Sequence, residues 1–276
     1  MTSAGPTGGS SAPPLRAVTF DFANTLVPVD RGLFRAVVQL TVNGAAGPCR
    51  IADRAAFQAA WEEERDRQFR EDVPAGREVD LVQRAARVLA RCRGLSPPPA
   101  EERWDDASAR RWSSQEERDL VVDLYSRSFI HAMPAPPEVG PLLERLAGHG
   151  LRLGVISNWP LSVTIERYVE AAGWAPLLAA VVVSERVGVI KPHPAIFAVA
   201  EKELGVPGPC ILHVGDDFMA DIVGAKRAGW RACYLRDQPQ DWPRQAVDAG
   251  SRETADLVID GLDQLEAGLA SVSTSA

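Results

Sequence analysis

The sequence contains very little lysine. Of its 276 residues only Lys191, Lys202 and Lys226 are lysines, and arginine supplies the rest of the 30 basic side chains. The 37 acidic residues outnumber the basic ones and leave a formal net charge of −7. Nucleic acids and anionic membranes repel a chain of this charge. The composition therefore argues against either of them as the main partner.

Long apolar runs and clustered cysteines are also missing. No run approaches the roughly 18 apolar residues that a membrane span needs. The N-terminal stretch MTSAGPTGGSSAPP has neither the basic region nor the apolar segment of a signal peptide. We therefore expect a cytoplasmic protein with reduced thiols, whose residues 1–14 form a disordered tail. Four cysteines lie far apart, without a CxxC pair or a histidine at zinc-binding spacing: Cys49, Cys92, Cys210 and Cys233.

Short apolar runs alternate with helical patterns along much of the chain. Runs of this kind, without polar alternation, are typical of strands covered on both faces of a parallel sheet. Helical patterns precede two of them, at residues 137–150 and 194–206. The alternation predicts an α/β fold with a doubly wound parallel sheet. The expected strands are residues 16–22, 152–158, 179–185, 210–216, 231–236 and 255–260.

Residues 30–133 have a different character. This interval is dense in Ala, Arg, Glu and Leu, as in RAAFQAAWEEERDRQFRED and EVDLVQRAARVLARC. Helical periodicity and composition predict a second, smaller all-α domain inserted into the α/β core. The core is then expected to comprise residues 15–29 and 134–265, followed by a flexible tail at 266–276.

Chemically active side chains follow several of the expected strands. Asp21 ends the first, Ser157 and Asn158 end the second, Lys191 comes after the third, and Asp216 ends the fourth. In an open parallel sheet, ligands bind at the carboxyl ends of the strands, near a topological switch point. Two carboxylates beside a lysine favour Mg²⁺, which prefers oxygen ligands together with substrate phosphate.

Four sequence motifs at these positions resemble those of the haloacid dehalogenase (HAD) superfamily. The segments VTFDFANTL, LGVISN, SERVGVIKPHPAIF and HVGDDFMADIVGAKRAGW are similar to the four motifs of that superfamily, in the same order. The helical insertion is similar to the C1-type cap of its phosphatase-like branch. That cap lids the site and selects the substrate.

The resemblance implies a role for each strand-end residue. Asp21 would be the catalytic nucleophile and would form an aspartyl-phosphate. Lys191 would be catalytic as well, balancing the negative charge of the phosphoryl group and the nucleophile. Ser157 and Asn158 would bind the substrate phosphate.

It also implies a metal site. Mg²⁺ would be held by Asp21, by Asp216 and by the backbone carbonyl of Ala23. Asp221 would support these ligands from outside. The implied protein is an Mg²⁺-dependent phosphatase of a small phosphorylated metabolite, and no pattern in the sequence indicates its oligomeric state.

Ala23 is the clear departure from the family pattern. Most phosphatases of the superfamily carry a second aspartate there, which protonates the leaving group and activates water. General acid–base help is worth ~10²–10⁴ in rate, or roughly 3–5 kcal/mol of barrier. A good leaving group, or an acid supplied by Asp30, Asp217 or the cap, would compensate for the alanine.

Two further hypotheses stay open beside the phosphatase. One is a metal-independent dehalogenase of 2-haloacids, since halide leaves without an acid. The other is a catalytically weak HAD-like binding protein. Phosphonoacetaldehyde hydrolases also carry alanine at this position, but they need a cap lysine and residues 30–133 contain none.

Several other polar and aromatic residues have simpler interpretations. We expect His213 to pack in the core and Trp159 to lie where it can touch substrate. The charged run from Glu62 to Asp72 is expected to form a solvated helix face. An arginine of this run that faced the cleft would favour an anionic substrate.

Overall fold

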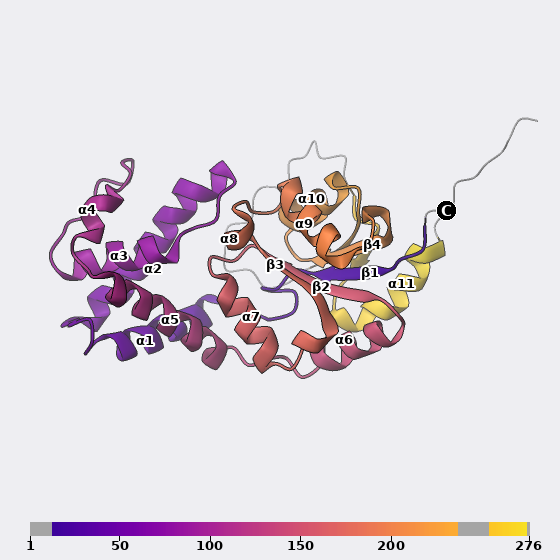
Figure 1. Ribbon diagram of the computed structural model, residues 1–276, viewed down its shortest axis with the longest axis horizontal. Helices are drawn as coiled ribbons and strands as arrows, with labels where there is room; N and C mark the ends of the chain where they lie inside the picture. Colours follow the sequence, from indigo (N-terminus) through magenta and orange to yellow (C-terminus); the bar gives the residue numbers. More distant parts are fainter. Residues whose placement is uncertain (1–12, 237–253, 275–276) are drawn as a thin grey trace, which may run out of the picture.

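The computed structural model describes residues 13–236 and 254–274. Nearly all of the tail predicted at residues 1–14 therefore lies outside the described residues. Figure 1 shows two groups of elements, a sheet with helices around it and a separate set of helices.

A parallel sheet of six strands forms the centre of the α/β part, as the sequence predicts. The strand order is β3-β2-β1-β4-β5-β6, and every neighbouring pair is parallel. The strands are β1 (Ala17–Phe20), β2 (Arg152–Ser157), β3 (Leu178–Val183), β4 (Ile211–Gly215), β5 (Arg231–Leu235) and β6 (Leu257–Ile259).

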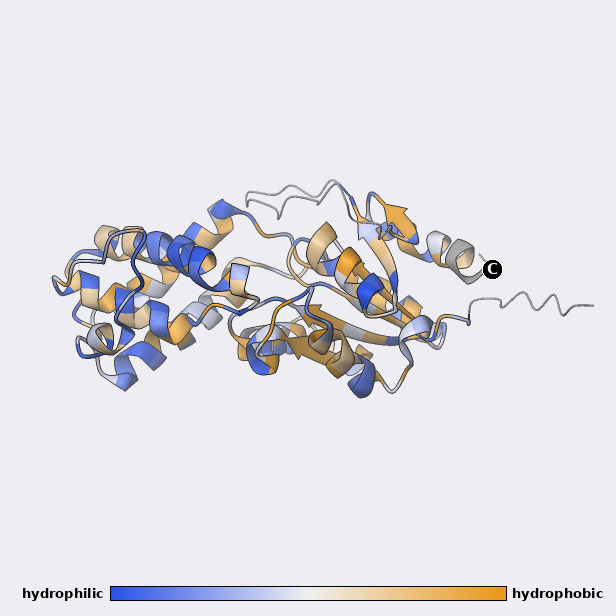
Figure 2. Cartoon of the chain, turned by 90° about the horizontal axis from the view of Figure 1, so that it is seen from above, coloured by the Kyte–Doolittle hydropathy of each residue, from blue (hydrophilic) through white to orange (hydrophobic). Residues whose placement is uncertain are grey.

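Helices cover both faces of this sheet, which explains its continuous apolar runs. Val155 packs on one face with Leu143 and Ile165, and its neighbour Ile156 packs on the other with Phe197. Helices α6, α7 and α11 lie on the first face, and α9 and α10 on the second (Figure 1). In Figure 2 most of the sheet is coloured hydrophobic, whereas the helices carry residues of both kinds. The helices are α6 (Val139–Gly148), α7 (Ser162–Ala171), α8 (Ser184–Val187), α9 (Pro194–Leu204), α10 (Gly224–Arg227) and α11 (Leu265–Thr274).

Residues 30–133, which the structure describes in full, contain five α-helices and no strand. We call this segment the helical insertion. A capping side chain precedes each helix and accepts a hydrogen bond from the first turn, which explains where the helices begin. The caps are Asp30, Asp53, Asp80, Asp105 and Ser114. The helices are α1 (Arg31–Ala45), α2 (Arg54–Asp72), α3 (Leu81–Cys92), α4 (Asp106–Arg110) and α5 (Gln115–Ala132).

The interior of the helical insertion combines aromatic packing with buried charge. Trp61 of α2 stacks on Tyr125 of α5, with ring centroids 5.1 Å apart. The fully buried Glu64 of α2 lies within 4 Å of Arg87 and Arg91 of α3. The run from Glu62 to Asp72 is therefore not solvated along its whole length.

The C-terminal tail corrects the sequence prediction. Residues 266–276 were expected to be flexible, but helix α11 spans Leu265–Thr274. Leu265 is fully buried, and Glu266 accepts a 2.7 Å hydrogen bond from Arg145 of α6. Contacts with residues far away in the sequence hold this helix in place.

The topology fixes where a ligand can bind. The chain runs from β1 outward to β3 and then returns to β4 on the other side of β1. The switch point therefore lies between β1 and β4, at whose carboxyl ends a crevice opens. Among the described residues, no helix is long and apolar enough to cross a membrane.

Candidate active site

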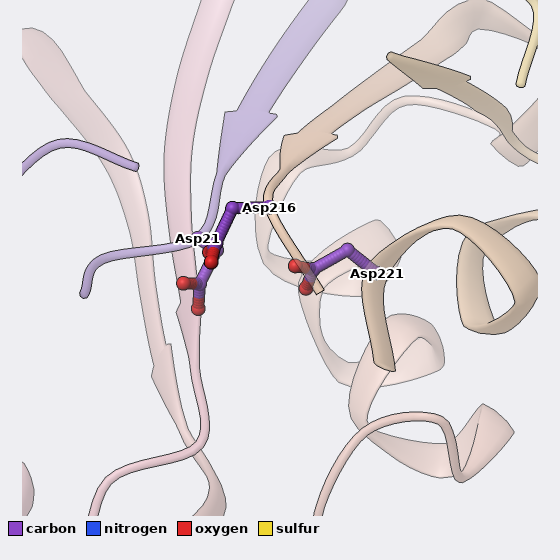
Figure 3. Close-up of side chains that lie close together, drawn as sticks. All are labelled: Asp21, Asp216 and Asp221. Atoms are coloured by element: carbon purple, nitrogen blue, oxygen red, sulfur yellow. The ribbon is translucent and has the colours of Figure 1, made fainter. Parts of the chain in front are cut away.

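Three carboxylates converge at the switch point. Asp21 directly follows β1, Asp216 directly follows β4, and Asp221 lies on the π-helical turn Phe218–Val223. One oxygen of each lies within 4.8 Å of the others. Figure 3 shows Asp21 and Asp216 at the strand ends and Asp221 facing them from the helical turn. The arrangement brings together oxygen donors of the type that Mg²⁺ prefers.

Lys191 connects these acids. Its ammonium group donates hydrogen bonds of 2.7 Å to Asp21 Oδ1, 2.6 Å to Asp221 Oδ1 and 2.7 Å to the Ile156 carbonyl. The side chain is 1% exposed, so these contacts replace nearly all of its hydration. Charge-assisted bonds of this length fix the position of the Asp21 carboxylate.

Burial and mutual repulsion shape the charges of the three acids. Burial raises the pKa of Asp21 to about 7, with Lys191 opposing the shift and Asp221 adding to it. Burial, together with repulsion from Asp21 and Asp221, raises the pKa of Asp216 to about 8. Asp221 is equally buried, but its contact with Lys191 and its hydrogen bond to His213 lower its pKa to about 2. A cation beside Asp21 and Asp216 would offset their repulsion.

Asp221 is held from several directions. Its Oδ2 accepts the Asp217 N–H at 3.0 Å, and its Oδ1 lies 3.2 Å from His213 Nε2. The other ring nitrogen of His213 lies 2.9 Å from Thr19 Oγ1. Gly215 leaves room for this acid, because a Cβ there would lie 2.2 Å from Asp221 Cγ. His213 is fully buried, as the sequence suggests, and it belongs to the hydrogen-bond network of the site.

The loop after β1 presents Ala23 to the site. Asn24 adopts the left-handed conformation, with φ of 59°, which asparagine tolerates better than most residues. Its N–H donates to the Val27 carbonyl, and its side chain accepts the Val29 N–H. In the part of the chain that the structure describes, the Ala23 carbonyl accepts no hydrogen bond. Its role as a metal ligand stays a prediction.

The two residues expected to bind phosphate have different surroundings. Ser157 is buried at the end of β2, and its hydroxyl has no hydrogen-bond partner among the residues that the structure describes. Asn158 bonds through both ends of its amide to the backbone of Lys191, at 2.7 and 3.1 Å. Asn158 thus positions Lys191, and a role of either residue in phosphate binding stays a prediction.

A cavity of about 320 Å³ opens above these residues. Its lining includes Asp21, Ala23, Asn158, Lys191 and Asp216 but not Ser157. Trp159 also lines it, as expected of a residue able to touch substrate. The helical insertion contributes other lining residues: Phe34, Arg65, Phe69, Val73, Glu78, Val79, Arg84 and Tyr125. A more open hollow beside α9, between residues 198 and 207, contains none of the strand-end residues.

The cavity distinguishes among the possible replacements for the missing acid. Asp217 and Glu78 line it, and burial raises the pKa of both carboxyl groups. Asp30 does not line it and accepts the Leu33 N–H as the cap of α1. Glu78 accepts a hydrogen bond from Ser184 Oγ at 2.5 Å.

Sequence reasoning missed two charged residues of the cavity. Glu78 lies in a connecting segment and Arg84 on α3, in a region expected to form helices of unknown orientation. Arg65 belongs to the charged run from Glu62 to Asp72, in which an arginine facing the cleft would favour an anionic substrate. No local pattern marks Glu78 or Arg84, since only the packing of the helical insertion turns them toward Asp21.

Comparison with known proteins matches this chain to a family of hydrolases. The model of the haloacid dehalogenase-like hydrolases matches residues 15–229. A curated relative, the glyceraldehyde 3-phosphate phosphatase of Methanopyrus kandleri, is 32% identical over 183 residues. The matched segment covers 63% of this chain and 76% of the relative.

Solved structures share the architecture. The 2-haloacid dehalogenase from Pseudomonas syringae pv. Tomato DC3000 has a TM-score of 0.61 and 24% identity, and covers 93% of this chain and 99% of its own. The putative HAD-hydrolase YfnB from Bacillus subtilis, solved bound to magnesium, has a TM-score of 0.59 and 19% identity at the same coverage. At these identities the likeness shows a common fold.

Proposed function

The chain belongs to the haloacid dehalogenase-like hydrolases, and we propose that it is an Mg²⁺-dependent phosphatase of a small phosphorylated metabolite. One observation carries the proposal. The carboxylates of Asp21 and Asp216 meet at the base of a cavity, and the buried Lys191 bonds to Asp21. The phosphatase named among the relatives supports the same chemistry.

Asp21 is the proposed nucleophile. Its ionised carboxylate attacks phosphorus, a new P–O bond forms, and the bond to the leaving alkoxide breaks; the alkoxide takes up a proton and departs as the alcohol. Water then attacks the aspartyl-phosphate, releasing inorganic phosphate and restoring the carboxylate. Lys191 keeps Asp21 oriented and, by its charge, favours the ionised form that the first step requires.

The residues present fit a magnesium ion. Asp21, Asp216 and the Ala23 carbonyl would hold it, since all three offer oxygen and line the same cavity. When bound, the ion supplies positive charge next to the nucleophile and the phosphoryl oxygens. Thr25 helps to orient one of its ligands, because its hydroxyl donates to Asp216 Oδ1 at 3.2 Å. Both oxygens of Asp221 already accept hydrogen bonds, so we assign it the positioning of Lys191.

Ser157 is the proposed contact for a phosphoryl oxygen. Its buried hydroxyl lacks a partner within the described chain, and an unmade hydrogen bond of this kind costs about 1–3 kcal/mol. Ser157 does not line the cavity, so a phosphoryl oxygen would have to reach past the lining to the end of β2 to satisfy it. Lys191 would add positive charge from the loop between α8 and α9.

Because residue 23 is alanine, the leaving group lacks the aspartate that usually protonates it. We propose Glu78 and Asp217 as the candidates that replace it, because both line the cavity and burial raises the pKa of both. A carboxyl group that stays protonated nearer neutral pH is a better proton donor there.

A dehalogenase is the second candidate, and Ala23 is the observation that favours it, since a halide leaves without an acid. One assay separates the two. Aryl and alkyl phosphates and 2-haloacids are offered to the wild type and to Asp21→Asn, with Mg²⁺ or with excess chelator. The proposal expects phosphate release that needs both Mg²⁺ and Asp21. Halide release that persists in chelator, without phosphate release, would replace it with the dehalogenase.

A further inference from the structure

Two arginines on the same helix, α3, are buried in different ways. Arg87 is 3% exposed and lies within 4 Å of carboxylate oxygens from Glu64, Glu71 and Asp106. Arg84, one turn earlier, is 2% exposed. Its Nε donates to the neutral Gln68 amide at 2.9 Å, and no carboxylate of residues 13–236 or 254–274 lies within ion-pairing distance of it.

The surroundings of Arg84 balance its charge only in part, through attraction to Glu78 and Tyr125 without an ion-pair contact. The guanidinium carbon lies 5.6 Å from the centre of the Trp61 ring. Glu78 shares the cavity, but its carboxylate bonds to Ser184 and to the Val79 N–H. Burial lowers the pKa of Arg84 to about 10, which still leaves it a cation at neutral pH. An uncompensated buried charge costs several kcal/mol, so an arginine held this way calls for a partner that arrives from outside.

The position of Arg84 indicates what that partner is. Its side chain lines the same cavity as Asp21 and Lys191, but it comes from the helical insertion. Arg65 of α2 lines the cavity too and donates to Asp66. Apolar side chains line the cavity as well, and the rings of Phe34 and Trp159 stack with their centroids 6.2 Å apart. The cavity thus combines arginines from the helical insertion, apolar side chains, and the acids and lysine of the α/β part.

We propose that Arg84, assisted by Arg65, binds a second anionic group of the substrate, a carboxylate or a second phosphate, remote from the phosphoryl group that is transferred. The proposal rests on the proposed phosphatase function and specifies its substrate class. A guanidinium presents a planar fork of N–H donors that matches either anion. Arg84 is therefore a specificity-determining residue.

Matched substrates test the proposal. In 3-phosphoglycerate a carboxylate replaces the hydroxymethyl group of glycerol 3-phosphate, and ribulose 1,5-bisphosphate adds a second phosphate to ribulose 5-phosphate. The wild type should prefer the anionic member of at least one pair in kcat/KM. Arg84→Gln should reduce that preference by ~30-fold or more, equivalent to about 2 kcal/mol at 1.4 kcal/mol per factor of ten. The pair that responds identifies the anion.

The exposed Arg54 of α2 gives a matched control for net charge, and Arg54→Gln should leave the preference unchanged. The proposal is overturned if neither anionic ester is preferred. It is also overturned if Arg84→Gln changes both members of a pair by the same factor, which is what a purely structural role predicts.

Stability measurements also distinguish a ligand-binding role of Arg84 from a purely structural one. If Arg84 awaits a ligand, Arg84→Met should keep or raise the Tm, because it removes a buried unpaired charge. Arg87→Met should lower the Tm, because Glu71 and Asp106 lose their arginine partner. An equal fall in both variants would contradict the proposal.

Ligand binding decides the matter even if the proposed function fails. In Asp21→Asn protein, which is expected not to consume its ligand, 3-phosphoglycerate or ribulose 1,5-bisphosphate should raise the Tm. Adding Arg84→Gln should remove that increase. If the wild type hydrolyses no phosphate ester in Mg²⁺, only the proposed function is refuted. The assignment of Arg84 is refuted if neither ligand raises the Tm, or if Arg84→Gln leaves the increase in Tm unchanged.

Discussion

Removal of Mg²⁺ should make the stability of this protein fall as the pH rises. Without the ion, the pKa values of Asp21 and Asp216 are about 7 and about 8, against 3.8 for an ordinary aspartate. At a pH between 3.8 and the raised pKa, each of these carboxyl groups keeps a proton in the folded state that the unfolded chain has released. The free energy of unfolding then falls by about 1.4 kcal/mol per pH unit for each such carboxylate. From about pH 5 to 7 the free energy of unfolding therefore falls by at most ~5 kcal/mol for the two acids together, which titrate as a pair.

Other groups of the site contribute differently. The pKa of Asp221 is lowered to about 2, so its contribution to stability is complete above pH 3.8 and is lost only as the pH falls toward 2. Burial lowers the pKa of His213, so its contribution to stability increases as the pH rises toward 6.5 and opposes the effect of the acids. A comparison of two proteins that both retain His213 removes this contribution.

The assay is urea unfolding of the wild type and of Asp216→Asn in chelator, at several pH values between about 5 and 7. The stability difference, wild type minus variant, should fall by about 1.4 kcal/mol per pH unit. Mg²⁺ at 100 times its Kd should then stabilise the wild type by about 2.7 kcal/mol and the variant much less. Parallel pH profiles in chelator would refute the raised pKa of Asp216. Equal stabilisation of both proteins by Mg²⁺ would refute its role as a ligand.

Three further substitutions test the site. Ala23→Asp should speed hydrolysis of alkyl phosphates by ~10²-fold or more, and of aryl phosphates less; equal effects on the two classes would mean that another acid already acts. Lys191→Met should abolish turnover and lower the free energy of unfolding by about 3–5 kcal/mol, because Asp21 and Asp221 lose their buried cation; unchanged urea unfolding would contradict this. Gly215→Ala should cost about 1–3 kcal/mol, since its Cβ would lie 2.2 Å from Asp221 Cγ; an unaltered Tm would show that this acid moves freely.

The sequence by itself determined the α/β architecture and the base of the site. Strands covered on both faces have continuous apolar runs, and the helices of the insertion have helical periodicity, so both signals are local. Asp21 and Asp216 could be paired from sequence because the carboxyl ends of parallel strands meet at one edge of a sheet. Family motifs then suggested a role for each residue.

Only the tertiary structure decided which residues of the helical insertion line the cavity and whether the C-terminal segment forms a helix. Helical periodicity places Arg84 and Arg87 one turn apart on α3, but it does not say which of them meets carboxylates and which faces a cavity. Nor does it show that Glu78 shares the cavity with Asp21. Helix α11 was missed because it depends on Leu265 and on the ion pair between Glu266 and Arg145, 121 residues earlier. Contacts between segments distant in sequence decide these features, and no local pattern contains them.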